Sequence, residues 1–145
     1  MQNSSPLQTV FYSIEKAIKE YRKYAQVSIL KHISDITLDQ TLVLMILNET
    51  PQITQKDIAN LLYKDNASLT RIIELMVKKG YLTRKKNHTD GRRSQLDITE
   101  KGKATIKKLS PVIIQNRSTA LEGLSEDEIS QLDSLLNKIT SNCTK

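Results

Sequence analysis

The chain has 145 residues, of which 38% are hydrophobic and 26% are charged, as in a globular domain with a sizeable core. Aromatic residues make up only 4%, which disfavours a single-stranded nucleic-acid binder that stacks bases on aromatic rings. The net charge of +6 is concentrated in residues 54–110, which carry fourteen basic and six acidic residues. Residues 1–53 carry five of each, and residues 111–145 carry three basic and five acidic residues. A basic middle between neutral and acidic flanks indicates a polyanionic partner.

Cellular location and membrane binding are constrained by three features. Cys143 is the only cysteine, so no internal disulfide can form. The N-terminal sequence MQNSSPLQTVFYSIEK has no signal-peptide pattern, and the longest apolar run, Leu42–Leu47, is far shorter than a membrane span. We therefore expect a cytoplasmic protein. A membrane surface would require a basic amphipathic helix with aromatic anchors, which the sequence lacks.

Two helices are expected in the first part of the chain. Apolar residues recur every three or four positions across residues 7–31, which predicts one long helix with a continuous apolar stripe. Thr37 and Gln40 form a capping box that opens a helix from Leu38 to about Asn48. This second helix is apolar almost all round, so we expect it to be buried on most sides.

The next two predicted helices are short and lie close together. Thr54 begins a capping signal for the first, and Asp65 or Asn66 can cap the second, which runs to Lys79 before Gly80. Two helices joined by a tight turn form the frame of a helix-turn-helix, although an ordinary amphipathic surface helix would show the same pattern. The outward face of the second helix carries these residues: Ala67, Ser68, Thr70, Arg71, Glu74 and Lys78.

A basic hairpin is expected after these helices. Residues 81–86 and 95–99 have the pattern of strands, and Asp90-Gly91 between them is a strong hairpin signal. The two adjacent arginines that follow, Arg92 and Arg93, suit the narrow minor groove of DNA. Taken alone, the hairpin tip could be a solvated charged turn, but its place after a helix-turn-helix indicates a wing.

The C-terminal part is predicted to be helical. Thr99 can cap a helix that runs towards Ala120, and Pro111 inside it is expected to cause a kink near Lys107 or a break. Ser125 and Glu128 form a second capping box, which opens a last amphipathic helix. We therefore expect a mainly α fold with a small β-hairpin wing (α+β), in which residues 36–99 form the winged helix-turn-helix.

The chain resembles the MarR family of bacterial regulators over nearly its whole length. The most specific match is Asp90-Gly91-Arg92-Arg93 followed by Leu96, Ile98, Thr99, Lys101 and Gly102, which resembles the wing of the family. The segment NASLTRIIELMVKKGYLTR, residues 66–84, resembles its recognition helix and first wing strand. The resemblance implies a homodimer that binds a pseudo-palindromic operator and usually represses nearby genes, with residues 1–35 and 100–145 as the dimerisation region.

The resemblance also assigns roles to single residues. It implies that Ala67, Ser68, Thr70 and Arg71 lie at the major groove, that Arg92 enters the minor groove, and that Asp90 braces the wing. Many members carry a hydroxyl where this chain has Ala67, so one contact is missing here or has moved to Ser68. The basic charge suggests that phosphates are contacted by Lys64, Lys85, Lys86, Arg92 and Arg93. Gln55 completes the predicted DNA-binding set.

Many family members bind small aromatic or phenolic effectors between the dimerisation region and the DNA-binding lobe. The resemblance makes Tyr21, Tyr24, His32 and Met45 candidates for such a pocket. For Tyr21 a place in the core is the simpler interpretation, and for His32 an ordinary surface position is.

Other chemistry has little support in the sequence. His32 and His88 have no partner at metal-ligand spacing, so we expect no metal site and no cofactor. The sequence has no phosphate-binding glycine loop and no nucleophile elbow, so we expect no enzyme activity. Cys143 is expected to be an ordinary free thiol near the chain end. The alternatives that remain are a winged helix that binds an acidic protein partner, and a DNA-binding activator or architectural factor without a ligand.

Overall fold

The computed structural model describes residues 4–86 and 94–145. Within these ranges the chain forms six helices and one antiparallel two-stranded sheet, which confirms the predicted fold class. The bounds are α1 Val10–Leu30, α2 Leu38–Glu49, α3 Gln55–Leu61, α4 Asn66–Lys78, β1 Leu82–Lys86, β2 Ser94–Ile98, α5 Glu100–Ala120 and α6 Glu126–Cys143.

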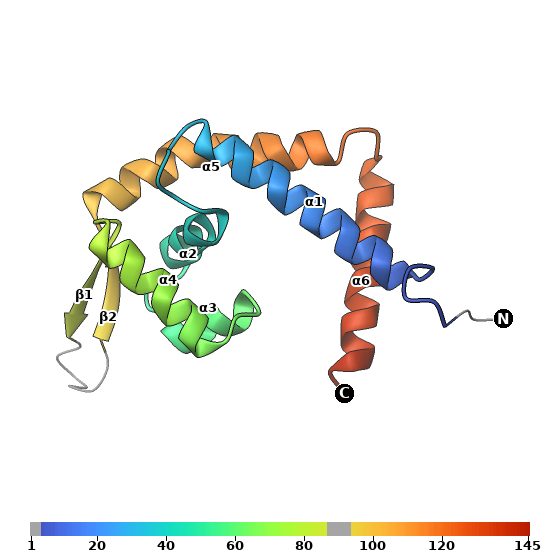
Figure 1. Cartoon of the computed structure of the whole chain (residues 1–145), viewed down its shortest axis with the longest axis horizontal. Coiled ribbons are helices and arrows are strands. Elements are labelled where there is room, and N and C mark those ends of the chain that lie inside the picture. The colour runs from blue at the N-terminus through green and yellow to red at the C-terminus, as the bar shows by residue number, and fades with distance from the viewer. Residues whose placement is uncertain (1–3, 87–93) are drawn as a thin grey trace.

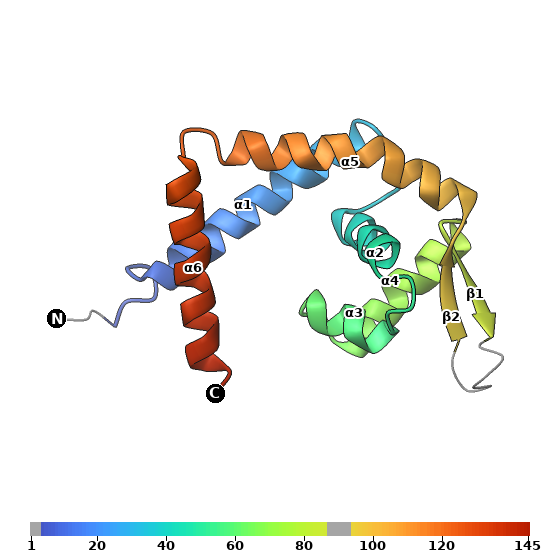
Figure 2. The same cartoon turned by 180° about the vertical axis from the view of Figure 1, so that it is seen from behind.

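The molecule consists of a compact lobe and an extended arm (Figure 1). The lobe contains α2, α3, α4, β1 and β2, and the arm contains α1, α5 and α6. In the arm, α1 packs against α5, whereas α6 turns steeply away from the end of α5 and lies apart from the lobe in both views (Figures 1 and 2). The hairpin lies at the end of the molecule opposite to both chain ends.

The helices begin where the capping signals predicted. Both complete capping boxes are present, at Thr37 with Gln40 and at Ser125 with Glu128. Single side-chain caps at Thr54, Asp65 and Thr99 open α3, α4 and α5. The predicted start of the first helix was three residues early, because the hydroxyl of Thr9 accepts the N–H of Tyr12 and so fixes the first helical residue at Val10.

Pro111 does not break α5, which runs without interruption from Glu100 to Ala120. The axis of the helix bends in its middle instead (Figures 1 and 2). A bend is the expected response, because proline removes one backbone donor and its ring crowds the carbonyl four residues earlier. Of the two outcomes predicted for this position, a break is therefore wrong.

The hydrophobic core lies in the lobe and where the lobe meets the C-terminal end of α1 and the middle of α5. Its largest fully buried side chains are Tyr81, Ile29, Ile36, Leu44, Leu47, Ile58, Leu69, Ile73, Met76, Leu82, Leu109 and Val43. The rest of the arm buries few side chains. No residue of α6 is buried, and α1 buries only Ala25 and Ile29. The predicted apolar stripe of α1 is therefore mostly open to solvent in one copy of the chain.

One polar contact joins the two long helices of the arm. The hydroxyl of Ser28 in α1 donates to Oδ1 of Asn116 in α5 at 2.9 Å. Asn116 is 3% exposed, and its Nδ2 has no hydrogen-bond partner among the described residues. The unsatisfied donor costs free energy, whereas the hydrogen bond from Ser28 requires the two helices to lie in this register.

The sheet is anchored to α5 by a tight backbone contact. The hydroxyl of Thr99 lies 2.6 Å from the carbonyl oxygen of Gly80 and accepts the N–H of Gly102 at 3.0 Å. A Cβ atom at Gly102 would lie 2.5 Å from the carbonyl oxygen of Tyr81 and 2.6 Å from Cγ2 of Ile98. The first turn of α5 thus approaches the sheet as closely as only glycine allows.

Gly102→Ala is predicted to destabilise the protein by about 2–3 kcal/mol, because the added methyl group must push α5 away from Tyr81 and from the end of β2. Urea unfolding followed by circular dichroism measures this change. Lys103→Ala, at the neighbouring exposed position, is the control and should shift stability by no more than about 0.5 kcal/mol. Equal stability of the two variants would show that the contact relaxes without cost.

Candidate nucleic-acid interface

Helices α3 and α4 are held together as one helix-turn-helix unit. The side-chain amide of Gln55, the first residue of α3, donates to the hydroxyl of Thr70 in α4 at 2.8 Å. Both residues are half-buried. These two predicted DNA-binding residues are therefore joined to each other by a hydrogen bond between the two helices.

The N-terminal turn of α4 carries the predicted base-reading residues. Asp65 caps the helix: its Oδ1 accepts the N–H of Ser68 at 2.7 Å and its Oδ2 accepts the hydroxyl of Ser68 at 3.2 Å. Arg71 in turn donates to the hydroxyl of Ser68 at 3.4 Å. Ala67 and Arg71 are exposed, whereas Ser68 is half-buried. The outward surface is thus a small methyl group beside an ordered guanidinium, which suits close approach to base edges.

The capping hydrogen bonds also hold down the pKa of Asp65. The backbone N–H and the hydroxyl of Ser68 favour the carboxylate over the neutral acid, and Arg71 adds a favourable charge. A protonated Asp65 would lose its acceptor role at the start of α4. The first turn of this helix is therefore most stable when Asp65 is ionised.

The turn between α3 and α4 has a strained residue. Tyr63 has a φ of 53°, in the left-handed region that side chains with a Cβ rarely adopt, and it is 89% exposed. Backbone hydrogen bonds from Tyr63 to Asn60 and from Lys64 to Ala59 hold the turn in this shape. This left-handed conformation allows the chain to change direction within the few residues between the two helices.

Lys64, next in this turn, points inward to a carboxylate. Its Nζ lies 3.0 Å from Oδ2 of Asp39, whose Oδ1 pairs with Nη2 of Arg22. Burial raises the pKa of Asp39, but hydrogen bonds from Lys64 and Arg22 outweigh it, so that the pKa lies below its usual range. A phosphate contact by Lys64 remains a prediction, and it would have to compete with Asp39.

Strand β1 carries three basic residues, and the exposure of two of them, Arg84 and Lys85, is described. Lys85 and Arg84 are both exposed, and Lys85 forms a surface ion pair with Asp97 of β2 at 3.2 Å. Such exposed pairs contribute little stability, so phosphate can replace Asp97 at small cost. The residues expected at the tip lie outside the described residues: His88, Asp90, Arg92 and Arg93. Nothing is described for the side chain of Lys86.

The base of the hairpin contains a cluster that the sequence did not reveal. The hydroxyl of Tyr81 donates to Oδ1 of Asp35 at 2.5 Å, and Nζ of Lys101 lies 4.4 Å from the centre of the Tyr81 ring. Nζ of Lys79 donates to the carbonyl oxygen of Asp35 at 2.6 Å. This cluster fastens the loop before α2 to the root of the wing.

The charge states of Asp35 and Tyr81 follow from this geometry. The Tyr81 hydroxyl and the two lysines hold the pKa of Asp35 below its usual range. Burial and the adjacent carboxylate raise the pKa of Tyr81 well above its usual value, so the phenol stays a donor at any working pH.

Comparison with known proteins agrees with this arrangement. The model of the MarR family matches residues 36–94. The transcriptional regulator SarZ of Staphylococcus haemolyticus, described as of the HTH type, is 27% identical over 136 residues, or 92% of this chain and 85% of its own length. The crystal structure of the transcriptional regulator SlyA is 26% identical, covers 94% of each chain and has a TM-score of 0.83. A variant of MarR from E. coli bound to operator DNA is 25% identical, covers 93% of this chain and 99% of its own, and has a TM-score of 0.75.

Residues 36–94 of the chain thus match the MarR family, and the chain as a whole is similar to transcription regulators over more than 90% of its length. It has the winged-helix fold of these DNA-binding regulators, with β1 and β2 as the wing. The matched range includes the whole helix-turn-helix and ends at the first residue of β2.

The four effector-pocket candidates are scattered in the structure. Tyr21 and Met45 are half-buried and pack against the core, whereas Tyr24 and His32 are exposed. A pocket made by these residues remains a prediction.

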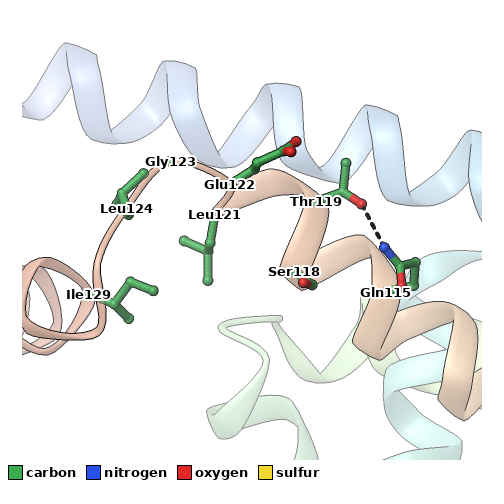
Figure 3. Close-up of a pocket in the computed structure, with 8 residues that line it drawn as sticks. All are labelled: Gln115, Ser118, Thr119, Leu121, Glu122, Gly123, Leu124 and Ile129. Atoms are coloured by element: carbon green, nitrogen blue, oxygen red, sulfur yellow. Dashed lines mark hydrogen bonds between the residues drawn. The ribbon is translucent and has the colours of Figure 1, made fainter.

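Two cavities are described, and none of the four residues lines either of them. One, of about 410 Å³, lies at the turn from α5 to α6, where Leu121 and Ile129 point into the same space (Figure 3). The other, of about 390 Å³, lies between α1 and the start of α2 and includes Arg22 and Asp39.

Two kinds of feature are absent from the described residues, 4–86 and 94–145. These residues contain no helix long and apolar enough to cross a membrane. They also contain no group of three or more His, Cys, Asp or Glu side chains placed to hold a metal ion. Cys143 is a free, exposed thiol at the last residue of α6.

The cap of α4 leads to a prediction about pH. Because the folded-state pKa of Asp65 is lowered, its stabilising contribution is complete above its unfolded pKa of about 3.9 and is lost as the pH falls through the folded value. Asp65→Asn keeps a good capping residue but removes the titrating group. The melting temperatures of the two proteins, measured from pH 7 to pH 3, should therefore converge on acidification. A constant difference across this range would contradict the assignment.

Proposed function

We propose that this protein is a homodimer that binds a pseudo-palindromic operator through two copies of α4 and represses the genes beside it until a small aromatic effector releases it. The observation that carries the dimer is the exposed apolar surface of the arm. The proposals of repression and of effector release rest on the resemblance to the MarR family. A dimer bound at a promoter would repress transcription because it blocks access of the polymerase.

The arm presents more apolar surface than a monomer in water would keep. Phe11 and Ile18 of α1 are 57% and 51% exposed, and Leu135 of α6 is 58% exposed. Further exposed apolar residues of the arm are Leu7, Val10, Val27, Leu30, Ile114, Leu124 and Leu132. Large exposed apolar surfaces mark interfaces, and a symmetric dimer buries the same surface of both copies. We therefore assign residues 1–35 and 100–145 to dimerisation and residues 36–99 to DNA binding.

In this proposal the contacts with DNA divide into two classes. Arg71, with Ala67 and Ser68 beside it, reads base edges in the major groove, because these residues lie on the outward side of the N-terminal turn of α4. Lys85 contacts phosphates, because its ammonium group lies on an exposed strand, and the positive charge of the other basic residues of the wing suits them to the same role. The two classes predict different behaviour of the variants.

Arg71→Ala is predicted to cost about 1–3 kcal/mol on a selected duplex and much less on a scrambled one. Lys85→Ala should weaken binding to both duplexes equally and lower the salt slope by about 1. Fluorescence anisotropy at several salt concentrations measures both effects, on a duplex that the wild type enriches from a random pool. Lys138→Ala, near the end of α6, is the charge-matched control. If Arg71→Ala lost equal affinity for both duplexes, Arg71 would contact only phosphate and would not read a base.

Leu135→Glu is predicted to dissociate the dimer. Each interface would contain two copies of the new carboxylate, and burying an unpaired charge costs several kcal/mol, which corresponds to a rise of about 100-fold or more in the dissociation constant. Sedimentation velocity at micromolar protein concentration measures the change. Leu61→Glu, which replaces an exposed leucine of the lobe, is the control and should remain a dimer. A wild-type monomer at this concentration would remove the two-site model.

A further inference from the structure

One carboxylate joins three parts of the molecule. Asp39, in the first turn of α2, pairs through Oδ1 with Arg22 of α1 and through Oδ2 with Lys64 of the turn before α4. The side chains are partly buried, with exposed fractions of 23% for Asp39, 30% for Lys64 and 41% for Arg22. We call these three residues the Asp39 bridge.

The two ends of the bridge lie at functionally different places. Arg22 belongs to the arm, whereas Lys64 directly precedes Asp65, the residue that caps the recognition helix. The backbone N–H of Lys64 is itself bonded to the carbonyl oxygen of Ala59 in α3 at 2.9 Å. A displacement of the Lys64 side chain would therefore shift both helices of the helix-turn-helix, because Lys64 is linked to α3 by this hydrogen bond and to α4 by the chain.

The bridge reaches further into the lobe than another polar contact of α1 with the lobe. The side chain of Gln26 in α1 donates to the carbonyl oxygen of Ile36 at 3.4 Å and accepts the N–H of Leu38 at 2.7 Å, and these hydrogen bonds end at the start of α2. The bridge continues from Asp39 to Lys64 in the turn before α4. A carboxylate shared by two cations has a defined geometry, and partial burial makes its charges less screened than those of a surface pair. The bridge is thus suited to fixing an orientation.

We propose that Asp39 is a positioning residue for DNA recognition, which fixes the recognition helix relative to the arm and so sets the distance between the two recognition helices of a dimer. The inference rests on the proposed function, because it needs two copies of the chain on one duplex. It assigns no DNA contact to Asp39, which acts through Lys64 and Arg22.

A competing explanation predicts the opposite effect. If Asp39 only withheld the ammonium of Lys64 from phosphate, Asp39→Asn would free that charge and tighten binding to every duplex. If Asp39 positions the recognition helix, the same variant loses affinity for the correctly spaced operator and tolerates a wrong spacing better. Affinity and spacing preference, measured together, separate the two.

The experiment uses three duplexes of equal length. One is selected by the wild type from a random pool, one carries a single inserted base pair between its half-sites, and one is scrambled. The insertion turns one half-site by about 35° and moves it by about 3.4 Å relative to the other. Asp57→Asn, in the first turn of α3, makes the same charge change on the same lobe without touching the bridge.

Asp39→Asn is expected to bind the selected duplex about 10-fold more weakly, within the usual range of coupling between sites, and to lose most of the discrimination against the inserted base pair. Asp39→Glu should retain part of that discrimination, because it keeps the carboxylate. In a Lys64→Met background, Asp39→Asn should change affinity by less than about 2-fold, because the bridge is already broken there. Asp57→Asn should shift all three affinities by the same small factor.

Equal losses of Asp39→Asn on all three duplexes, or an unchanged spacing preference, would overturn the positioning role. Should Asp39→Asn fail to fold, the spacing preference of Lys64→Met supplies the test, since this variant breaks the bridge at its other end; its overall affinity does not, because Lys64 is also a predicted phosphate contact. Failure of the wild type to enrich any duplex would overturn the proposed function itself. A normal enrichment together with identical spacing preferences overturns the positioning role alone.

Discussion

The structure depends on an unequal distribution of apolar burial along one chain. The lobe closes around a complete core, in which Leu44, Ile73 and Tyr81 are fully buried, whereas α6 buries no residue. Hydrophobic burial is the main force that orders a helix against its neighbours, so α6 and the outer part of α1 lack that force in one copy. A second copy supplies it in our proposal, whereas the lobe has its core within one copy.

The wing is held to the rest of the lobe by hydrogen bonds and a close backbone approach at the base of the hairpin. Thr99 and Gly102 bring the first turn of α5 against the strands, and the hydroxyl of Tyr81 reaches Asp35 in the loop before α2. The two strands themselves carry little apolar surface beyond Leu82, Leu96 and Ile98, and a lone hairpin is barely stable in water. The wing is therefore held as an extension of α5 and α2.

Local signals in the sequence predicted the helix starts well, because a cap such as Thr37 with Gln40 needs only residues three positions apart. Contacts between distant residues were out of reach. The inward orientation of Lys64 depends on where α2 places Asp39, and the partner of Tyr81 depends on the path of the loop at Asp35. Similarly, the apolar spacing of α1 identified its stripe but not the fact that one copy leaves most of it exposed.

The turn at Tyr63 has a consequence for how the protein responds to selection. A bulky residue held at a φ of 53° raises the energy of the native backbone, by an amount on the order of 1 kcal/mol, without any buried contact in return. A residue that adopts a positive φ more readily at this exposed position would therefore raise the free energy of unfolding. A library screened only for heat resistance would be enriched early in glycine or asparagine at position 63, and persistence of the tyrosine in a library screened for gene regulation would reveal a cost that the folded state bears for function.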